Sequence, residues 1–337
     1  MKFCGIDLHS NNSVVVITDD LDQRLVSCRC PNDLNTILTV LKPHQADLAG
    51  VVVESTYNWY WLVDGLMAAG FAVKLANTVA MKQYEGLKHR DDVDDAAHLA
   101  HLLRLGLLPT GYIHPPEERA LRDVARKRIQ LVRTRTQQVL AVENILARER
   151  GARLSNNAIQ RMTVAEVAAL GLRADVALAM QANIAVITTL NQAIEDLETR
   201  LLAGVKPRPE YALLKSVPGI GAVLATVIML EAGDMTRFAQ VGQFASYARC
   251  VDSAHYSNGK KKGAGNTKNG NAYLAWAFIE AANFARRFNP QARRFFERKK
   301  AKTTPIVATK ALAHKLARAC YHMLKEKQPF DVRRCFA

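Results

Sequence analysis

The sequence predicts an α/β domain over residues 1–110, followed by a mainly α-helical remainder. Short apolar runs bounded by turn residues fill the first 110 residues, whereas helical periodicity dominates after Pro109. The charge changes at the same point. Residues 1–110 hold 9 basic and 13 acidic side chains, and residues 111–337 hold 37 basic and 18 acidic ones. A chain of 337 residues is long enough for two or three domains, each with its own core.

In the first domain we expect strands and helices in a recognisable order. The expected elements are strands at 2–7, 13–18 and 24–28, a helix at 32–41, a strand at 48–53, a helix at 57–69, a strand at 72–75 and a helix at 92–105. The β-branched run at 48–53 indicates a strand buried on both faces. Three strands joined by turns, followed by strands alternating with helices, match the order of an RNase H-like fold.

Residues 111–205 are predicted to form a helical linker domain. After a short linker at 110–116, we expect a helix over 117–150, without Gly or Pro, and further helices over 165–180 and 184–202. In the last of these, apolar residues recur at threes and fours, as in a coiled-coil seam: Ile184, Ile187, Leu190, Ile194, Leu197 and Leu201. This short seam fits pairing within the chain and pairing between chains equally well.

Residues 206–337 are predicted to form a helical C-terminal domain. Helices are expected over 271–288 and 304–325, with a loop rich in Gly, Lys and Asn before the first of them. The segment SVPGIG places Gly219 and Gly221 between two apolar helical stretches, as in a helix-hairpin-helix. Such a turn presents backbone N–H groups to a phosphate. The alternative is that the glycines only allow the two helices to pack closely.

The composition excludes several classes of protein. Apolar residues make up 49% of the chain, and Gly and Pro are few, which excludes a disordered chain. No apolar run approaches the roughly 18 residues of a membrane helix, and the start MKFCGIDLHS lacks the apolar core of a signal peptide. The six scattered cysteines do not have the spacing of a zinc site. We therefore expect a cytoplasmic protein with reduced thiols and no membrane partner.

The net charge of +15 indicates a polyanionic partner. The excess of basic residues lies entirely in residues 111–337, whose net charge is +19, whereas residues 1–110 carry −4. Nucleic acid is the usual polyanion for a cytosolic chain, so we expect the protein to associate with the nucleoid. A basic surface that serves only solubility is the alternative.

Four acidic residues stand where predicted strands end or a helix begins. Asp7 closes the first strand, and Glu54 follows the apolar run VVV. Asp92 and Asp95 are three residues apart, so both project from one face of the helix. Ligands collect at the carboxyl ends of strands in an open α/β sheet. Converging carboxylates suit Mg²⁺ or Mn²⁺, which hold phosphate oxygens during phosphoryl transfer, although each acid alone could be a cap or a solvated turn.

The segment YSNGKKKGAGNTKNGN, residues 256–271, is predicted to be a flexible cationic loop. It does not match a Walker motif in any register. Its backbone donors and its lysines could clamp a phosphodiester, the lysines being Lys260, Lys261, Lys262 and Lys268. Ser257 in this loop could act as a nucleophile if a metal or a base activates it. A loop serine without such a partner is inert.

Together these motifs resemble those of a known family. GIDLHS, VVVEST, RDDVDDAAHLA, SVPGIG and NGKKKGAGNTKNGNAYLAWAF occur in the order found in insertion-sequence transposases of the one-ten family, and they look closest to its eleven-eleven subgroup. The resemblance covers nearly the whole chain. It implies a RuvC-like (RNase H-like) domain with a DEDD metal site, which maps onto Asp7, Glu54, Asp92 and Asp95. It also implies a coiled-coil segment and a C-terminal transposase domain with a catalytic serine.

The same resemblance implies partners and a reaction. Such enzymes recombine double-stranded DNA at element ends and targets, guided by a structured bridge RNA, and four strands suggest a homodimer or tetramer. Alignment on Gly263 puts Ser257 at the nucleophile position, with Ser253 and Thr267 as alternatives. Asp91 with Asp94 is the alternative to the helix pair. Two other classes stay open: a RuvC-like nuclease that uses metal-activated water, and a non-catalytic nucleic-acid-binding protein.

Overall fold

The computed structural model describes residues 1–81, 91–251, 254–264 and 269–336. It divides the chain into two compact units, Met1–Pro116 and Glu117–Ala337. The first unit therefore includes the short segment 111–116 that follows the predicted α/β domain. Within the second unit, residues of the predicted linker share one apolar core with residues of the predicted C-terminal domain. The assignment of a separate function to each of those two parts stays a prediction.

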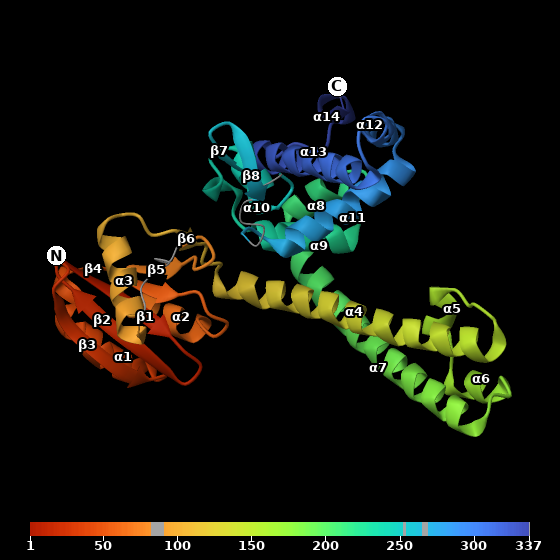
Figure 1. Ribbon diagram of the computed structural model, residues 1–337, viewed down its shortest axis with the longest axis horizontal. Coiled ribbons are helices and arrows are strands. Elements are labelled where there is room, and N and C mark those ends of the chain that lie inside the picture. Colours follow the sequence, from red (N-terminus) through yellow and green to blue (C-terminus); the bar gives the residue numbers. More distant parts are fainter. Residues whose placement is uncertain (82–90, 252–253, 265–268, 337) are drawn as a thin grey trace. The chain divides into compact units, whose positions relative to one another are not determined.

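The first unit contains one mixed sheet with the strand order β3-β2-β1-β4-β5-β6 (Figure 1). The first three strands are antiparallel neighbours, β1 is parallel to β4 and β4 to β5, and β6 is antiparallel to β5. The strands are β1 Lys2–Leu8, β2 Asn12–Thr18, β3 Arg24–Pro31, β4 Leu48–Glu54, β5 Val73–Ala76 and β6 Thr110–Gly111. This order confirms the predicted α/β class for the first unit.

Helices cover both faces of this sheet. Val51 and Val53 of β4 belong to one apolar cluster with helices α1 (Leu34–Leu41) and α2 (Tyr60–Ala68). Val52, between them, packs on the opposite face with α3 (Asp92–Arg104). Because successive side chains of a strand point to opposite faces, a strand covered on both sides must be apolar throughout. That explains the uninterrupted apolar run of β4.

Helix α3 lies directly against β1. A Cβ atom at Gly5 of β1 would lie 1.9 Å from the carbonyl oxygen of Ala96 and 2.9 Å from the backbone nitrogen of Ala100. Ala96 and Ala100 are one turn apart on α3, and both are fully buried. The absent side chain of Gly5 and the small side chains of the helix therefore bring the start of α3 close to the edge of the sheet where β1 ends.

Two long helices of the second unit, α4 (Pro116–Arg150) and α7 (Ala174–Val205), pack antiparallel (Figure 1). Arg128 of α4 donates to Glu198 of α7 at 2.7 Å, and Asn183 of α7 donates to Gln138 of α4 at 2.7 Å. Several residues of the predicted seam are buried in clusters that also contain α4 residues: Ile184, Ile187 and Leu201. The seam therefore pairs within the chain.

The continuous helix predicted over residues 165–180 is wrong. The chain forms α5 (Asn156–Arg161) and α6 (Val164–Ala169) and then turns at Gly171 before α7 begins. Gly171 has a φ of 60°, in the left-handed region that glycine adopts without strain and that ends helices. The periodicity of the apolar residues continues across this turn, which is why the pattern alone suggested one helix.

The remaining helices share one apolar core with α9, whose residues 224–232 are all buried. They are α8 Pro209–Lys215, α9 Ala222–Ala232, α10 Val241–Tyr247, α11 Ala272–Phe288, α12 Pro290–Lys300, α13 Pro305–Glu326 and α14 Val332–Phe336. Short 3-10 helices occur at Lys42–Asp47 and Met235–Arg237. Among the described residues, no helix combines the length and apolar character needed to cross a membrane. All six cysteines are free.

The cationic loop predicted over residues 256–271 is in part a β-hairpin, so the prediction of a loop is wrong there. Strand β7 (Ala254–Ser257) pairs antiparallel with β8 (Lys260–Ala264). Asn258 and Gly259 connect them with φ angles of 50° and 70°. Two-residue hairpin turns with positive φ at both positions favour Asn-Gly, because the turn then matches the twist of the strands. The Asn-Gly pair was the overlooked signal.

Candidate functional site

Asp7 and Glu54 meet where two parallel strands end. In the register of β1 and β4, Ile6 lies beside Val53, so Asp7 follows on one strand where Glu54 closes the other. Asp7 is only 3% exposed, and the two carboxyl groups share a hydrogen bond. Burial, this bond and the charges of Asp7 and Asp95 raise the pKa of Glu54 to about 8. Glu54 therefore holds a proton near neutral pH in the absence of a cation.

The start of α3 supplies the other carboxylates. Asp91 caps the helix, because its side chain accepts a hydrogen bond from the backbone N–H of Asp94 at 2.9 Å. Asp94 in turn pairs with Arg24 of β3 at 2.5 Å. Asp95 lies close enough to Glu54 for its charge to raise the pKa of that residue. Asp92 and Asp95 thus lie at the sheet edge beside Asp7 and Glu54. Asp91 and Asp94 are instead occupied by the helix cap and by the ion pair with Arg24.

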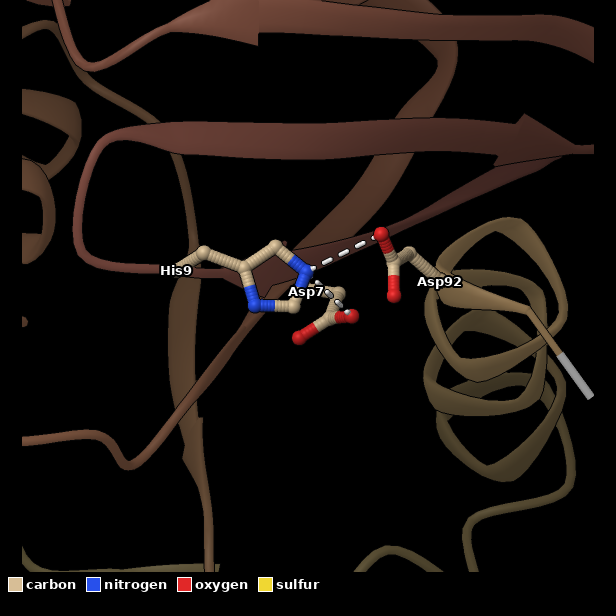
Figure 2. A group of neighbouring side chains, drawn as sticks. All are labelled: Asp7, His9 and Asp92. Carbon is tan, nitrogen blue, oxygen red and sulfur yellow. Dashed lines mark ion pairs between the residues drawn. The ribbon is translucent and has the colours of Figure 1, made fainter.

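His9 joins this cluster, although it is not among the four acidic residues expected from the sequence. Its Nε2 atom lies 3.3 Å from a carboxylate oxygen of Asp7 and 3.3 Å from one of Asp92 (Figure 2). The three side chains together could hold one cation. Asp7 and His9 are two residues apart at the end of a strand, a spacing that places both side chains on one face. That spacing was the available signal.

Arg29 and two asparagines surround the cluster. Arg29 of β3 donates to Asp92 at 2.6 Å, and this bond holds the pKa of Asp92 below its usual value. The side chains of Asn32 and Asn58 donate to the backbone carbonyl of His9 at 3.0 and 2.9 Å. Loops that follow β3 and β4 therefore fix the turn that follows β1, and with it the backbone from which the imidazole extends.

This arrangement fits a divalent metal ion. Several carboxylates converge at one sheet edge, and burial together with the neighbouring carboxylates raises the pKa of one of them, Glu54. Among the described residues, the buried Nε2 of His9 makes no well-aligned hydrogen bond, although it points between two carboxylate oxygens. Oxygen-rich sites of this kind suit Mg²⁺ or Mn²⁺. Asp7, His9, Glu54, Asp92 and Asp95 are the residues that could hold the ion.

Ser257 lies on the hairpin of the second unit. It ends β7, pairs with Lys260 across the hairpin and is exposed. Lys260 and Lys262 are also exposed, so the hairpin presents cations beside the serine. Ser253, Thr267 and Lys268 lie outside the described residues, as does the side chain of Lys261.

Hydrogen bonds anchor residues 269–271, which follow the hairpin in the sequence. Arg249 donates to the backbone carbonyls of Asn269 and Gly270 at 3.0 Å each. Asn271 caps α11 and donates to the buried carboxylate of Glu231 at 2.6 Å. Burial alone would raise the pKa of Glu231, but ion pairs with Arg126 and Arg122 outweigh it and hold that pKa below its usual value. The segment that follows the hairpin is thus tied to the core.

A polar groove lies at the foot of the hairpin. Among the described residues, its lining includes the cationic side chains of Arg249 and Lys310 and no carboxylate. The other polar side chains that line it are Gln240, Gln243, Ser246, Tyr247 and Asn269. Cations together with amides and hydroxyls are the groups that contact nucleic-acid backbones and bases.

The two glycines of the SVPGIG turn differ in their surroundings. Gly219 has a φ of 88°, and a Cβ atom there would lie 2.3 Å from the carbonyl oxygen of Ala281 and 2.6 Å from the backbone nitrogen of Ala285. Close packing of this turn on α11 therefore explains why residue 219 is a glycine. Gly221 is the N-cap of α9, and space is open around it. A phosphate contact at this turn stays a prediction.

Comparisons with known proteins point to one family. A DEDD transposase model matches residues 4–149, and the model of the transposase IS116/IS110/IS902 family matches residues 211–297. A probable family 20 transposase of Pseudomonas aeruginosa is 25% identical over 69% of this chain and 70% of its own length. The transposase for insertion sequence element IS1111A of Coxiella burnetii is 23% identical over 67% of this chain and 62% of its own. A protein of insertion element IS110 from Streptomyces coelicolor is 26% identical over 44% of this chain and 36% of its own.

Proposed function

Because the chain belongs to the IS116/IS110/IS902 family of transposases, we propose that it cuts and rejoins the DNA strands of an insertion sequence with a metal-assisted serine nucleophile. The convergence of carboxylates at the ends of β1 and β4 supports this most strongly. Strand packing requires no carboxylate there, and burial, a hydrogen bond to Asp7 and the neighbouring charges together raise the pKa of Glu54. Such a cluster is suited to the phosphate chemistry of DNA.

The carboxylates would bind Mg²⁺ or Mn²⁺ at the scissile phosphate. The proposed ligands are Asp7, Glu54, Asp92 and Asp95. When bound, the ion neutralises charge that develops on the phosphate oxygens. Glu54 must give up its proton as the ion binds, and Asp7 is held in place by its burial in β1. Arg29 orients Asp92 by its hydrogen bond.

Ser257 is the proposed nucleophile. Its Oγ forms a bond to phosphorus, the bond from phosphorus to a deoxyribose oxygen breaks, and the leaving alcohol takes up a proton while the serine loses one. The DNA is then joined to the protein as a phosphoserine. Attack by a strand hydroxyl reverses these changes, so strands can be rejoined to a new partner without ATP. The exposed lysines of the hairpin would hold the flanking phosphates.

Nucleic acid would contact the second unit over a wide basic surface. Residues 117–337 hold the whole excess of basic side chains, and the groove at the foot of the hairpin is lined by cations and amides. We include a structured guide RNA among the proposed partners, together with the DNA of the element ends and the target. The open N-terminus of α9 at Gly221 is a proposed phosphate contact. A homodimer or tetramer would handle the four strands.

Trapping of the covalent intermediate tests this function. Purified full-length protein is incubated with radiolabelled element-end DNA and Mg²⁺ or Mn²⁺, denatured and separated by electrophoresis. We expect a labelled adduct with the wild type, none with Ser257→Ala and none with Asp7→Asn. Ser27→Ala, which changes an exposed strand serine, is the matched control and should retain the adduct.

Two outcomes would change the proposal. Loss of the adduct with Ser253→Ala but not with Ser257→Ala would move the nucleophile within the hairpin segment. Metal-dependent cleavage without any adduct would identify a RuvC-like nuclease that uses activated water. Absence of cleavage with every metal and every element-end substrate would leave nucleic-acid binding alone.

A further inference from the structure

We propose that His9 is a nitrogen ligand of the metal held by the carboxylates, and that it shifts the preference of the site from Mg²⁺ toward Mn²⁺. This inference rests on the proposed function, since it requires that the site binds a divalent ion. It adds a residue outside the four carboxylates and names the ion that the site favours.

The position of the imidazole is that of a ligand. Nitrogen and oxygen ligands lie about 2.0–2.2 Å from ions of this size, so two neighbouring ligands at a right angle are about 3 Å apart. Nε2 of His9 is 3.3 Å from an oxygen of Asp7 and 3.3 Å from an oxygen of Asp92. One ion can therefore contact all three groups with little movement (Figure 2).

The ion pairs of His9 with the two carboxylates are longer than a direct charge-assisted hydrogen bond. Charge-assisted N–H···O bonds are about 2.7–2.9 Å long, and Arg29 already makes such a bond to Asp92 at 2.6 Å. At 3.3 Å from each oxygen, Nε2 is more distant and makes no well-aligned hydrogen bond among the described residues. A buried nitrogen aimed between two carboxylates in this way is placed to share a cation with them.

The backbone holds His9 in this position before any ion binds. Its N–H donates to the carbonyl of Asn12 at 2.9 Å. Its own carbonyl accepts from the side chains of Asn32 at 3.0 Å and Asn58 at 2.9 Å. The first residue of β2 and two other loops thus fix the backbone of one residue in the β1–β2 turn. Such fixation lowers the cost of ordering the backbone that carries the imidazole when a metal binds.

The imidazole determines which ion is favoured. Mg²⁺ prefers oxygen ligands and readily keeps water in place of a protein group. Later first-row divalent ions accept imidazole nitrogen more willingly, and Mn²⁺ accepts it together with carboxylates. Exchange of His9 for an amide should therefore weaken the binding of Mn²⁺ much more than that of Mg²⁺.

Spectroscopy and calorimetry on the full-length protein test this without relying on activity. In the wild type with bound Mn²⁺, pulsed electron paramagnetic resonance should detect hyperfine coupling to a nitrogen nucleus. The coupling should vanish in His9→Gln and His9→Asn. By titration calorimetry, either substitution should weaken Mn²⁺ binding by roughly tenfold, and Mg²⁺ binding by about twofold at most. His44→Gln, a histidine in contact with Lys2 at the start of β1, is the matched control and should retain the coupling and both affinities.

The outcomes separate this inference from the function on which it rests. A wild-type Mn²⁺ spectrum without nitrogen coupling overturns the inference, and so does an equal loss of Mn²⁺ and Mg²⁺ affinity in both His9 variants. Binding of neither ion by the wild type would overturn the metal-assisted function as well. Circular dichroism melts identify a variant that fails to fold, and the second His9 variant then supplies the comparison.

Discussion

Burial and the neighbouring carboxylates together raise the pKa of Glu54. Its pKa is about 8 in the folded protein, against an ordinary value of 4.5, so between these values the folded state binds more protons than the unfolded state. The metal-free protein should therefore lose stability as the pH rises from about 4.5 to about 8, and Glu54→Gln should lack this dependence. Urea unfolding at about pH 5 and about pH 8.5 measures it. A wild type whose stability is flat over this range would contradict the raised pKa.

The start of α3 gives a second prediction, since neighbouring aspartates have different contacts. Asp91→Ala should cost about 1 kcal/mol of stability, because it removes the helix cap, but it should leave DNA cleavage in place. Asp95→Ala should abolish cleavage, because Asp95 lies beside Glu54. Urea unfolding and a cleavage assay on both variants provide the comparison. An active Asp95→Ala protein with an inactive Asp91→Ala protein would assign the other register.

The sequence allowed the four carboxylates to be chosen, because Asp7 and Glu54 each end an apolar strand in which packing requires no charge. It did not single out His9. A histidine in a turn is usually solvated, and its position here depends on hydrogen bonds from Asn32 and Asn58, which are distant in sequence. Contacts of that kind depend on tertiary structure, and no local pattern encodes them.

At the scale of elements, the contact between β1 and α3 places the carboxylates. Gly5→Ala would put a methyl group within 1.9 Å of the carbonyl oxygen of Ala96, so the helix must move away from the sheet. We expect a loss of about 1–3 kcal/mol of stability, and weaker metal binding because Asp92 and Asp95 move with the helix. Gly111→Ala in β6 meets only ordinary contacts and is the control. Urea unfolding and calorimetry measure both effects, and wild-type metal affinity in Gly5→Ala would contradict this role of the contact.

Helices and strands were predictable where one hydrophobic periodicity, or one uniform amino-acid composition, extended over the whole element. The strands of the first unit follow from short apolar runs, and α4 follows from 34 residues without Gly or Pro between Glu117 and Arg150. The errors arose at single glycines. Gly171 ends a helix within continuous apolar periodicity, and Gly259 follows Asn258 in a hairpin turn within a segment whose lysines suggested a loop. Backbone conformation at such residues overrides the composition around them.

At the scale of the whole molecule, the charge is divided between the two compact units. Residues 1–116 hold 9 basic and 13 acidic side chains, so nucleic acid should bind through residues 117–337. Affinity should fall with salt, with a slope of about −0.7 to −0.9 in log–log units for each phosphate contact. Replacing Lys260 and Lys262 by Ala should make the slope less steep by the amount that about two phosphate contacts contribute. Fluorescence anisotropy over a salt series measures this, and equally tight binding by a 1–116 fragment would contradict it.

The proposed carboxylates and Ser257 belong to different units of the chain, so a complete site can combine them from one chain or from two. We predict that it combines two chains, as the proposed homodimer or tetramer would allow. If sites are shared between chains, a mixed dimer of Ser257→Ala and Asp7→Ala chains contains two sites. One of them is intact, and the other carries both substitutions. Random assortment should then restore about one quarter of the sites. Adduct formation in an equimolar mixture of the two variants, with the presence of mixed oligomers verified, measures this fraction. If each site is built within one chain, every site carries a lesion, and the mixture will form no more adduct than either variant alone.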